Sequence, residues 1–228
     1  MSIKKLDWDS DFFNLEIGEV NLEKDNCVID ADAYDLVYVK SKNDSQLDIK
    51  GYQNTFTDQT LIYIKDLEKK ENEIEIENIF PFDENKFPIE KLYELAYVGG
   101  SFSRFNLDTK FDKEKFKKLY RTWIDNSLNG KNADELLVYE ENGELMGFVT
   151  YKIDNDIATY YLLAVLPQYQ GKKIGIKLFE YVAQKMRNLN VKKLMIPTQR
   201  SNVGACYIYE KLGYTILEKK YIKHYWKI

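Results

Sequence analysis

The sequence predicts an α/β (α+β) fold, and three observations carry that prediction. Apolar strand-like segments alternate with amphipathic helical segments from about residue 74 onward. Asn142-Gly143 joins two apolar runs, and this pair is the strongest short signal for a β-hairpin. The apolar run that ends at Val165 passes through a loop rich in glycine and lysine into an amphipathic segment that begins at Ile174.

Composition limits the class of protein. The chain has 228 residues, 44% of them hydrophobic, which suits one large domain or two small ones. The net charge of −4 argues against nucleic acid as a partner. Two cysteines without ligand spacing and a single histidine, His224, predict no metal site, no disulfide scaffold and a cytoplasmic location. The N-terminus lacks an apolar signal core and no apolar run approaches the ~20 residues of a membrane span, so we expect no membrane partner.

The first third predicts strands and turns, with apolar runs at 36–39 and 60–64 around Gly51-Tyr52. A charged run over 66–72 predicts a boundary between a small N-terminal domain, residues 1–70, and a second domain, residues 71–228. Gly51-Tyr52 followed by an aromatic strand resembles Gly213-Tyr214 and the strands after it. We therefore interpret the first domain as a degenerate half-repeat of the same α/β unit, without its phosphate loop.

The second domain predicts its elements in order. A strand is expected around Ile74 to Ile79, a helix from Pro88 to Gly99-Gly100, and a loop over 101–108. Asp112 caps a second helix with an apolar face, which ends at Asn129-Gly130. The remaining expected elements are strands 136–139, 145–151, 157–165 and 192–196, helices from 174 and over 202–212, and two terminal strands, 214–219 and 221–227.

The loop after Val165 predicts an anion site, because a strand-to-helix junction offers free backbone N–H groups and the positive end of a helix dipole. A cofactor with a pyrophosphate fits there. Two nucleotide motifs fail on spacing. A Rossmann site requires Gly-x-Gly-x-x-Gly, and a P-loop requires Gly-Lys-Ser/Thr after four spacers, whereas this loop has only Gly171 and Gly175.

Two motifs in this order resemble the GNAT superfamily of acyl-CoA-dependent N-acyltransferases. Gln170-Gly171-Lys172-Lys173-Ile174-Gly175 is similar to the phosphate loop of that family, Gln/Arg-x-x-Gly-x-Gly/Ala, with Lys173 where the family has glycine. The segment 202–214 is similar to Asn-x-x-Ala-x-x-x-Tyr-Glu-Lys-x-Gly-Phe/Tyr. The resemblance covers about residues 73–228. It implies a mixed, mostly antiparallel sheet that splays at the cofactor strand, with flanking helices and acetyl-CoA as acyl donor.

The resemblance also implies residue roles. The implied cofactor contacts are the strand residues Leu163, Ala164 and Val165 for the pantetheine arm, the loop residues Gln170, Gly171, Lys172, Lys173, Ile174, Gly175 and Ile176 for the pyrophosphate, and Asn202 for the arm. Tyr209 is implied as the acid that protonates the departing thiolate, because a phenol stays protonated at neutral pH. If the loop follows the path of the family, Lys173 adopts its conformation without the freedom of glycine.

Each of these residues has a structural alternative. Tyr209 lies on an apolar helix face with Ala205 and Leu212, where a tyrosine is often part of the core. Asn202 suits an N-cap, and Gly175 suits close helix–sheet packing. Lys172 and Lys173 are alternatively solvated surface residues. No carboxylate occupies the strand before the loop, so the base is not evident; Tyr161 and Thr159 either anchor waters or belong to the core.

The acceptor site is expected in the loop 99–112, with Arg104 between Phe102 and Phe105. An arginine fork suits phosphate or pyrophosphate, and aromatic faces suit a sugar or base; Tyr161 is expected nearby. The alternative is a surface Arg104 paired with Asp108. A second resemblance rests on segments 6–13, 103–105, 120–127 and 224–226, which look like the branch that contains TDP-fucosamine acetyltransferase.

This second resemblance implies transfer of acetyl from acetyl-CoA to the amine of a nucleotide-linked deoxy sugar, by direct attack through a tetrahedral intermediate. The GNAT family often forms dimers, so the first resemblance implies a homodimer. Two other functions stay open. One is the same reaction on a peptide N-terminus, a polyamine or an antibiotic. The other is a CoA-binding module without turnover, which Lys173 and the missing base suggest.

Overall fold

The computed structural model of the protein describes residues 3–22, 31, 33–67 and 76–228. The strands are β1 (Lys4–Lys5), β2 (Ile17–Leu22), β3 (Leu36–Ser41), β4 (Tyr52–Asp66), β5 (Ile79–Pro81), β6 (Glu135–Glu141), β7 (Glu144–Asp154), β8 (Ile157–Val165), β9 (Lys193–Gln199) and β10 (Thr215–Lys227). The helices are α1 (Asp7–Phe13), α2 (Ile89–Gly99), α3 (Arg104–Leu107), α4 (Lys113–Leu128), α5 (Ile174–Asn188) and α6 (Val203–Lys211).

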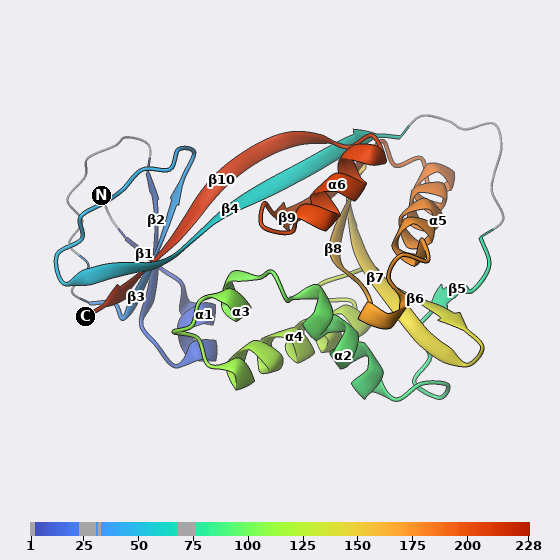
Figure 1. Cartoon of the computed structure of the whole chain (residues 1–228), viewed down its shortest axis with the longest axis horizontal. Coiled ribbons are helices and arrows are strands. Elements are labelled where there is room, and N and C mark those ends of the chain that lie inside the picture. The colour runs from blue at the N-terminus through green and yellow to red at the C-terminus, as the bar shows by residue number, and fades with distance from the viewer. Residues whose placement is uncertain (1–2, 23–30, 32, 68–75) are drawn as a thin grey trace.

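The described strands form one ten-stranded sheet in the order β1-β2-β3-β10-β4-β9-β8-β7-β6-β5 (Figure 1). The pairs β2–β3 and β8–β9 are parallel, and the other pairs are antiparallel. This confirms the predicted mixed, mostly antiparallel sheet with flanking helices. The division at residue 70 and the half-repeat stay predictions, and Ile74 and most of the charged run lie outside the described residues.

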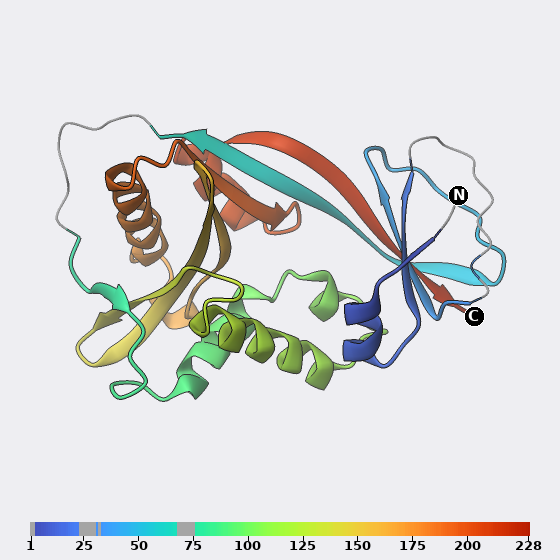
Figure 2. The same cartoon turned by 180° about the vertical axis from the view of Figure 1, so that it is seen from behind.

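Strands β1, β2 and β3 form one end of this sheet, called the small N-terminal sheet below. The long strands β4 and β10 connect it to the central strands (Figures 1 and 2). The prediction of two terminal strands was wrong, because β10 is continuous. The polar run Glu218-Lys219-Lys220 looks like a turn in the sequence, but these residues keep pairing with β4, after a bulge that follows Ile216. A strand can carry such a run where one of its faces meets solvent.

Two apolar layers cover the two faces of the central sheet. On one face α5 and α6 contribute Leu178, Val182, Met186 and Tyr209 to a buried cluster. On the other face α2 and α4 pack with α1 and α3 in a second cluster. The predicted cap of α4 is confirmed, since the Asp112 carboxylate accepts the Glu114 N–H at 2.9 Å. The sequence analysis missed α1, a short helix without a side-chain cap.

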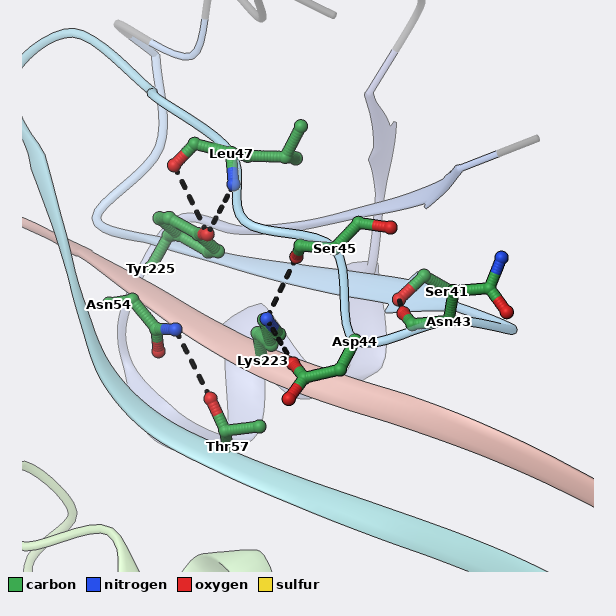
Figure 3. Close-up of polar contacts among 9 residues, drawn as sticks. All are labelled: Ser41, Asn43, Asp44, Ser45, Leu47, Asn54, Thr57, Lys223 and Tyr225. Carbon is green, nitrogen blue, oxygen red and sulfur yellow. Dashed lines mark hydrogen bonds and ion pairs between the residues drawn. The ribbon is translucent and has the colours of Figure 1, made fainter. Parts of the chain in front are cut away.

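Alternate residues near the end of β10 hold opposite parts of the protein. Lys223 and Tyr225 face the segment between β3 and β4 (Figure 3). The Lys223 ammonium lies 2.6 Å from an Asp44 carboxylate oxygen and donates to the Ser45 carbonyl at 2.8 Å. The Tyr225 hydroxyl accepts the Leu47 N–H and donates to the Leu47 carbonyl. His224 and Trp226 lie on the other face of the strand, toward Asp108.

The buried Lys223 gives an asymmetric stability prediction. Its side chain is 0% exposed, whereas that of Asp44 is 57% exposed. Asp44→Asn leaves a buried ammonium without its counter-charge and should cost roughly 2 kcal/mol of unfolding free energy. Lys223→Met removes the buried charge and leaves Asp44 to water, so it should cost less than about 1 kcal/mol. Urea unfolding measures both, and a greater loss in Lys223→Met than in Asp44→Asn would contradict the prediction.

Candidate active site

β8 and β9 pair over only three residues. Their parallel register joins Ile157–Thr159 to Lys193–Met195, and beyond it β9 continues beside β4. On its other edge β8 stays paired with β7 as far as Val165. The two strands therefore diverge after Thr159, and among the described residues no strand pairs with the freed edge of residues 160–165 (Figure 1).

The free edge of β8 presents the backbone groups of alternate residues. Leu166 donates its N–H to Met146 on β7 at 2.9 Å, and Leu162 donates to the Thr150 hydroxyl at 3.0 Å. Successive N–H groups of a strand point to opposite edges, so the N–H groups of Leu163 and Val165 point into the gap between β8 and β9. An extended chain that carries amide groups can bind there as an added strand does.

The loop after β8 ends directly in the first turn of α5. Gln170 donates its side-chain amide to the Val165 carbonyl at 3.1 Å, and Gly171 has a φ of 80°. The N–H of Lys177 bonds the Lys173 carbonyl, so the N–H groups of residues 174–176 precede the first helical hydrogen bond. These groups and the helix dipole are what an anion requires. The geometry fits a pyrophosphate, and the assignment of the individual loop residues stays a prediction.

Lys173 adopts the left-handed backbone conformation that its place in the loop motif predicts. Its φ of 63° lies in the left-handed region, where a side chain costs energy that glycine avoids. Lys172 is not strained in this way, and its ammonium lies 5.1 Å from the centre of the Tyr169 ring. A Cβ on Gly175 would meet Val165 and Leu163 at 3.8 and 3.9 Å, which is ordinary contact. Close packing alone therefore does not require glycine at position 175.

Asn202 and Tyr209 come from α6, which packs beside the gap. The Asn202 side chain accepts the Ala205 N–H at 3.3 Å, so the residue is an N-cap, and it also lines the cleft described below. The Tyr209 ring packs edge-on against Tyr63 and Phe179. Burial raises the pKa of the Tyr209 phenol well above its usual range, although a hydrogen bond with the Thr198 hydroxyl opposes this shift. The phenol is therefore held in its acid form.

One cleft of about 1010 Å³ joins the gap between β8 and β9 to the small N-terminal sheet. Its wall includes Leu163, Asn202 and Tyr209 from the cofactor motifs, and Arg104 from α3. Trp8 and Asp9 on α1 and Asp58 on β4 also line it. The long strand β4 runs from the N-terminal part of the chain to the central sheet (Figure 2), and residues of both parts line this cleft.

Arg104 lies at the end of this cleft that is nearer to the small N-terminal sheet, between aromatic rings. The centre of its guanidinium is 4.0 Å from the Tyr38 ring centroid and 4.5 Å from that of Phe105. One of its nitrogens contacts the His224 imidazole at 3.4 Å. The alternative of an Arg104–Asp108 pair was wrong, because the Asp108 side chain bonds His224, Trp226 and the Lys110 backbone instead.

The other predicted acceptor residues have different settings. Tyr161 lines the cleft and is 53% exposed, so it is not a core residue. Phe105 reaches the cleft but is mostly buried, and its ring stacks on Phe13. Phe102 is 38% exposed and does not line this cleft. Their roles in binding an acceptor stay predictions.

The sequence analysis missed three residues of the cleft. Burial raises the pKa of the Asp58 carboxyl, and the Gln59 N–H and the charge of Arg104 oppose the shift. Burial likewise raises the pKa of Asp9, again against Arg104. Trp8 is 52% exposed and stacks on Phe12 with ring centroids 5.0 Å apart. Asp58 stands before the expected strand 60–64 and no motif surrounds it, so the sequence offered no signal for its place in the cleft.

Two kinds of feature are absent from the described part of the chain. No group of three or more histidine, cysteine or acidic residues in it is arranged to hold a metal ion. None of its helices is long and apolar enough to span a membrane.

The comparison with known families agrees with the geometry. A sequence profile of the Acetyltransferase (GNAT) family matches residues 100–214, which include the diverging strands, the loop and α6. The chain belongs to the GNAT family of acetyltransferases. Acetyl-CoA is the acyl donor of this family.

Two curated relatives show how far the likeness extends. The spore coat polysaccharide biosynthesis protein SpsD of Bacillus subtilis (strain 168) is 28% identical over 137 residues, which cover 60% of this chain and 47% of that protein. The [ribosomal protein bS18]-alanine N-acetyltransferase of Escherichia coli (strain K12) is 27% identical over 94 residues, 40% of this chain and 64% of that protein. The chain thus spans less than two thirds of the length of either relative.

Solved structures show the fold. A functionally unknown conserved protein from Staphylococcus epidermidis aligns with a TM-score of 0.57 at 16% identity, over 86% of this chain and 74% of that one. A GCN5-related N-acetyltransferase from Sphaerobacter thermophilus aligns with a TM-score of 0.55 at 14% identity, over 83% and 59% of the two chains. The predicted GNAT fold is confirmed.

The left-handed backbone at Lys173 gives a stability prediction. Lys173→Gly should have a larger unfolding free energy than Lys173→Ala by about 1 kcal/mol, because glycine relieves the strained φ and alanine does not. At Lys172, where φ is not positive, the order should reverse. Thermal or urea unfolding of the four variants measures this. An alanine variant at position 173 as stable as the glycine variant would contradict the strain.

Proposed function

We propose that this protein transfers the acetyl group of acetyl-CoA to the amino group of a nucleotide-linked deoxy amino sugar. One observation carries the proposal: a single cleft contains the free edge of β8 with Tyr209 and, toward the small sheet, Arg104 with Asp58. A donor and an anionic acceptor have room to meet there. The likeness to a spore coat polysaccharide biosynthesis protein supports a sugar as acceptor.

The donor is held mainly by backbone. In the proposed complex the N–H groups of Leu163 and Val165 pair with the amides of the pantetheine arm, with Ala164 between them. The N–H groups of residues 171–176 surround the pyrophosphate, and the charges of Lys172 and Lys173 add attraction. Gln170 braces the loop against β8, and the Asn202 side chain contacts the arm.

The acetyl transfer needs one acid and one base. The acceptor nitrogen attacks the thioester carbon, a C–N bond forms and the C–S bond breaks. Tyr209 donates its proton to the departing thiolate, and its raised pKa keeps that proton available at neutral pH. The ammonium of the acceptor must first lose a proton. We assign that proton to Asp58, through water, because burial makes this carboxylate more basic. After the attack the nitrogen loses a second proton, which returns through water to the Tyr209 phenolate, and Asp58 releases its proton to solvent. The products are an amide and free CoA.

The acceptor end favours an anionic, ring-containing molecule. Within the described residues Arg104 forms no ion pair, so its charge is available to a phosphate. The half-exposed Trp8 offers a face on which a base or sugar stacks. A second candidate acceptor is a peptide N-terminus, which the likeness to a ribosomal-protein alanine acetyltransferase favours.

A panel of amines separates these functions. Release of free thiol from acetyl-CoA is measured with a nucleotide-linked amino sugar, the same amino sugar without the nucleotide, a peptide with N-terminal alanine and a polyamine. The proposal expects the nucleotide-linked sugar to have the highest kcat/KM. Faster turnover of the peptide would support the second candidate. Binding of acetyl-CoA in calorimetry without turnover of any amine would indicate a CoA-binding module.

Tyr209→Phe tests the acid. The ring packing is kept and only the hydroxyl is lost, so affinity for acetyl-CoA in calorimetry should not change. The kcat should fall by roughly 100-fold, the usual effect of removing a general acid. Tyr214→Phe, a second buried tyrosine in the same cluster, is the matched control and should keep its kcat. An unchanged kcat in Tyr209→Phe would remove this residue as the acid.

Asp58→Asn tests the base through pH. The wild-type kcat/KM should fall at low pH with an apparent pKa above the usual aspartate value, because Asp58 must be ionised to accept the proton. Near neutral pH the kcat/KM of Asp58→Asn should be roughly 100-fold lower than that of the wild type. The difference in kcat/KM between the variant and the wild type should shrink as the pH approaches the pKa of the acceptor amine, because the amine then arrives already deprotonated. Asp9→Asn is the control, and an equal pH profile in both variants would count against Asp58.

A further inference from the structure

Asp108, His224 and Arg104 form a line from the core to the wall of the cleft. The His224 Nδ1 lies 2.6 Å from Asp108 Oδ2, which also accepts the Trp226 indole N–H at 2.9 Å. On the other side of the ring, His224 Nε2 lies 3.4 Å from Arg104 Nη1. Asp108 and His224 are almost completely buried, at 1% and 0% exposure, whereas Arg104 reaches the cleft.

The two neighbours of His224 determine its tautomer. Burial opposes ionisation of Asp108, but the hydrogen bonds from His224 and Trp226 outweigh it and hold the pKa of this carboxyl below its usual value. An ionised carboxylate only accepts, so the proton of a neutral imidazole lies on Nδ1. Nε2 is then a bare acceptor, and Arg104, which only donates, faces it. Either the other tautomer or an imidazolium would place two donors against each other.

The ring also stays uncharged. Burial is the main cause that lowers the pKa of His224, to about 4, and the charge of Arg104 lowers it further, while Asp108 opposes both. The rings of Tyr38, Phe56 and Phe111 surround the imidazole, with centroids 4.8 to 5.7 Å away. His224 is therefore an acceptor for Arg104 and not a competing cation.

The contact with His224 restricts how Arg104 presents its charge. Tyr38 and Phe105 lie against the guanidinium, and His224 takes one of its N–H groups. The remaining N–H groups are left for the cleft, in an orientation that three separate elements impose: β3 through Tyr38, α3 through Phe105 and β10 through His224. A fork that is fixed before binding loses less entropy when it grips a phosphate.

We propose that Asp108 and His224 are positioning residues that orient Arg104 toward an anionic group of the acceptor. This inference rests on the proposed function for the identity of the acceptor, but its geometry does not. Asp108 sets the imidazole tautomer, the imidazole holds Arg104, and Arg104 alone touches the ligand. The buried residues Asp108 and His224 thereby fix the orientation of Arg104. Aromatic side chains alone would fill the same space but would offer Arg104 no hydrogen-bond acceptor.

Two amide variants separate orientation of Arg104 from simple packing. The Asn side chain reaches about as far as His Nδ1, so His224→Asn keeps a donor for Asp108 and loses the acceptor for Arg104. The Gln side chain reaches about as far as Nε2, so His224→Gln keeps an acceptor for Arg104. His224→Asn should raise the KM for the nucleotide-linked amino sugar roughly tenfold, with kcat and the KM for acetyl-CoA unchanged. His224→Gln should keep the KM for the same sugar within about threefold of the wild-type value.

A second acceptor makes this test specific. For the same amino sugar without its phosphates, His224→Asn should leave the KM unchanged, because Arg104 has no anion to grip. Equal KM increases for both acceptors, or equal defects in the Asn and Gln variants, would overturn the proposal and leave His224 as a packing residue.

A third measurement needs no acceptor, and its main readout comes from the wild-type protein. His224 is the only histidine in the chain, so ¹⁵N-histidine labelling of a protein without a histidine tag gives the NMR signals of this one ring. At pH 7 we expect a protonated Nδ1 and a bare Nε2, with the Nε2 signal displaced in Arg104→Lys. A protonated Nε2 would overturn the proposal. If the tautomer is as expected but no amine is acetylated, the proposed function fails and the positioning network stands.

Discussion

The divergence of β8 from β9 is the constraint on which the rest of the site depends. Three paired residues hold the two strands together, and β9 then follows β4 while β8 follows β7. The freed edge of β8 offers the N–H groups of Leu163 and Val165, and the same strand ends at the loop that opens α5. Continuous pairing of β8 with β9 would fill this edge with backbone and leave no place for an extended donor.

The acceptor end depends on the long pair of β4 and β10. Both strands run from the central sheet into the small N-terminal sheet, so residues far apart in the chain reach one cleft (Figure 1). β4 brings Asp58, and β10 brings His224 beneath Arg104. The polar groups in this region are therefore set by strand register, whereas the donor end is set by a local loop and one helix.

Local signals in the sequence predicted the strand, loop and helices of the proposed donor end. The loop at 170–175 and the motif on α6 are contiguous, and the left-handed backbone of Lys173 follows from its place where glycine is expected. The acceptor end was less accessible. Asp108 and His224 are 116 residues apart and meet only because β10 stays continuous through a polar run that looks like a turn. Asp58 lacked any neighbouring motif, and α1 lacked a cap, so neither had a signal that sequence alone could weigh.

In the proposed complex the free edge of β8 binds the donor, and amide hydrogen exchange by NMR tests this binding most directly. Without ligand, the N–H groups of Leu162 and Ala164 point toward β7, and those of Leu163 and Val165 point into the gap. Addition of acetyl-CoA should slow exchange at Leu163 and Val165 selectively, while Leu162 and Ala164 are already protected. Unchanged exchange at Leu163 and Val165 under saturating acetyl-CoA, with calorimetry showing that it is bound, would contradict the account.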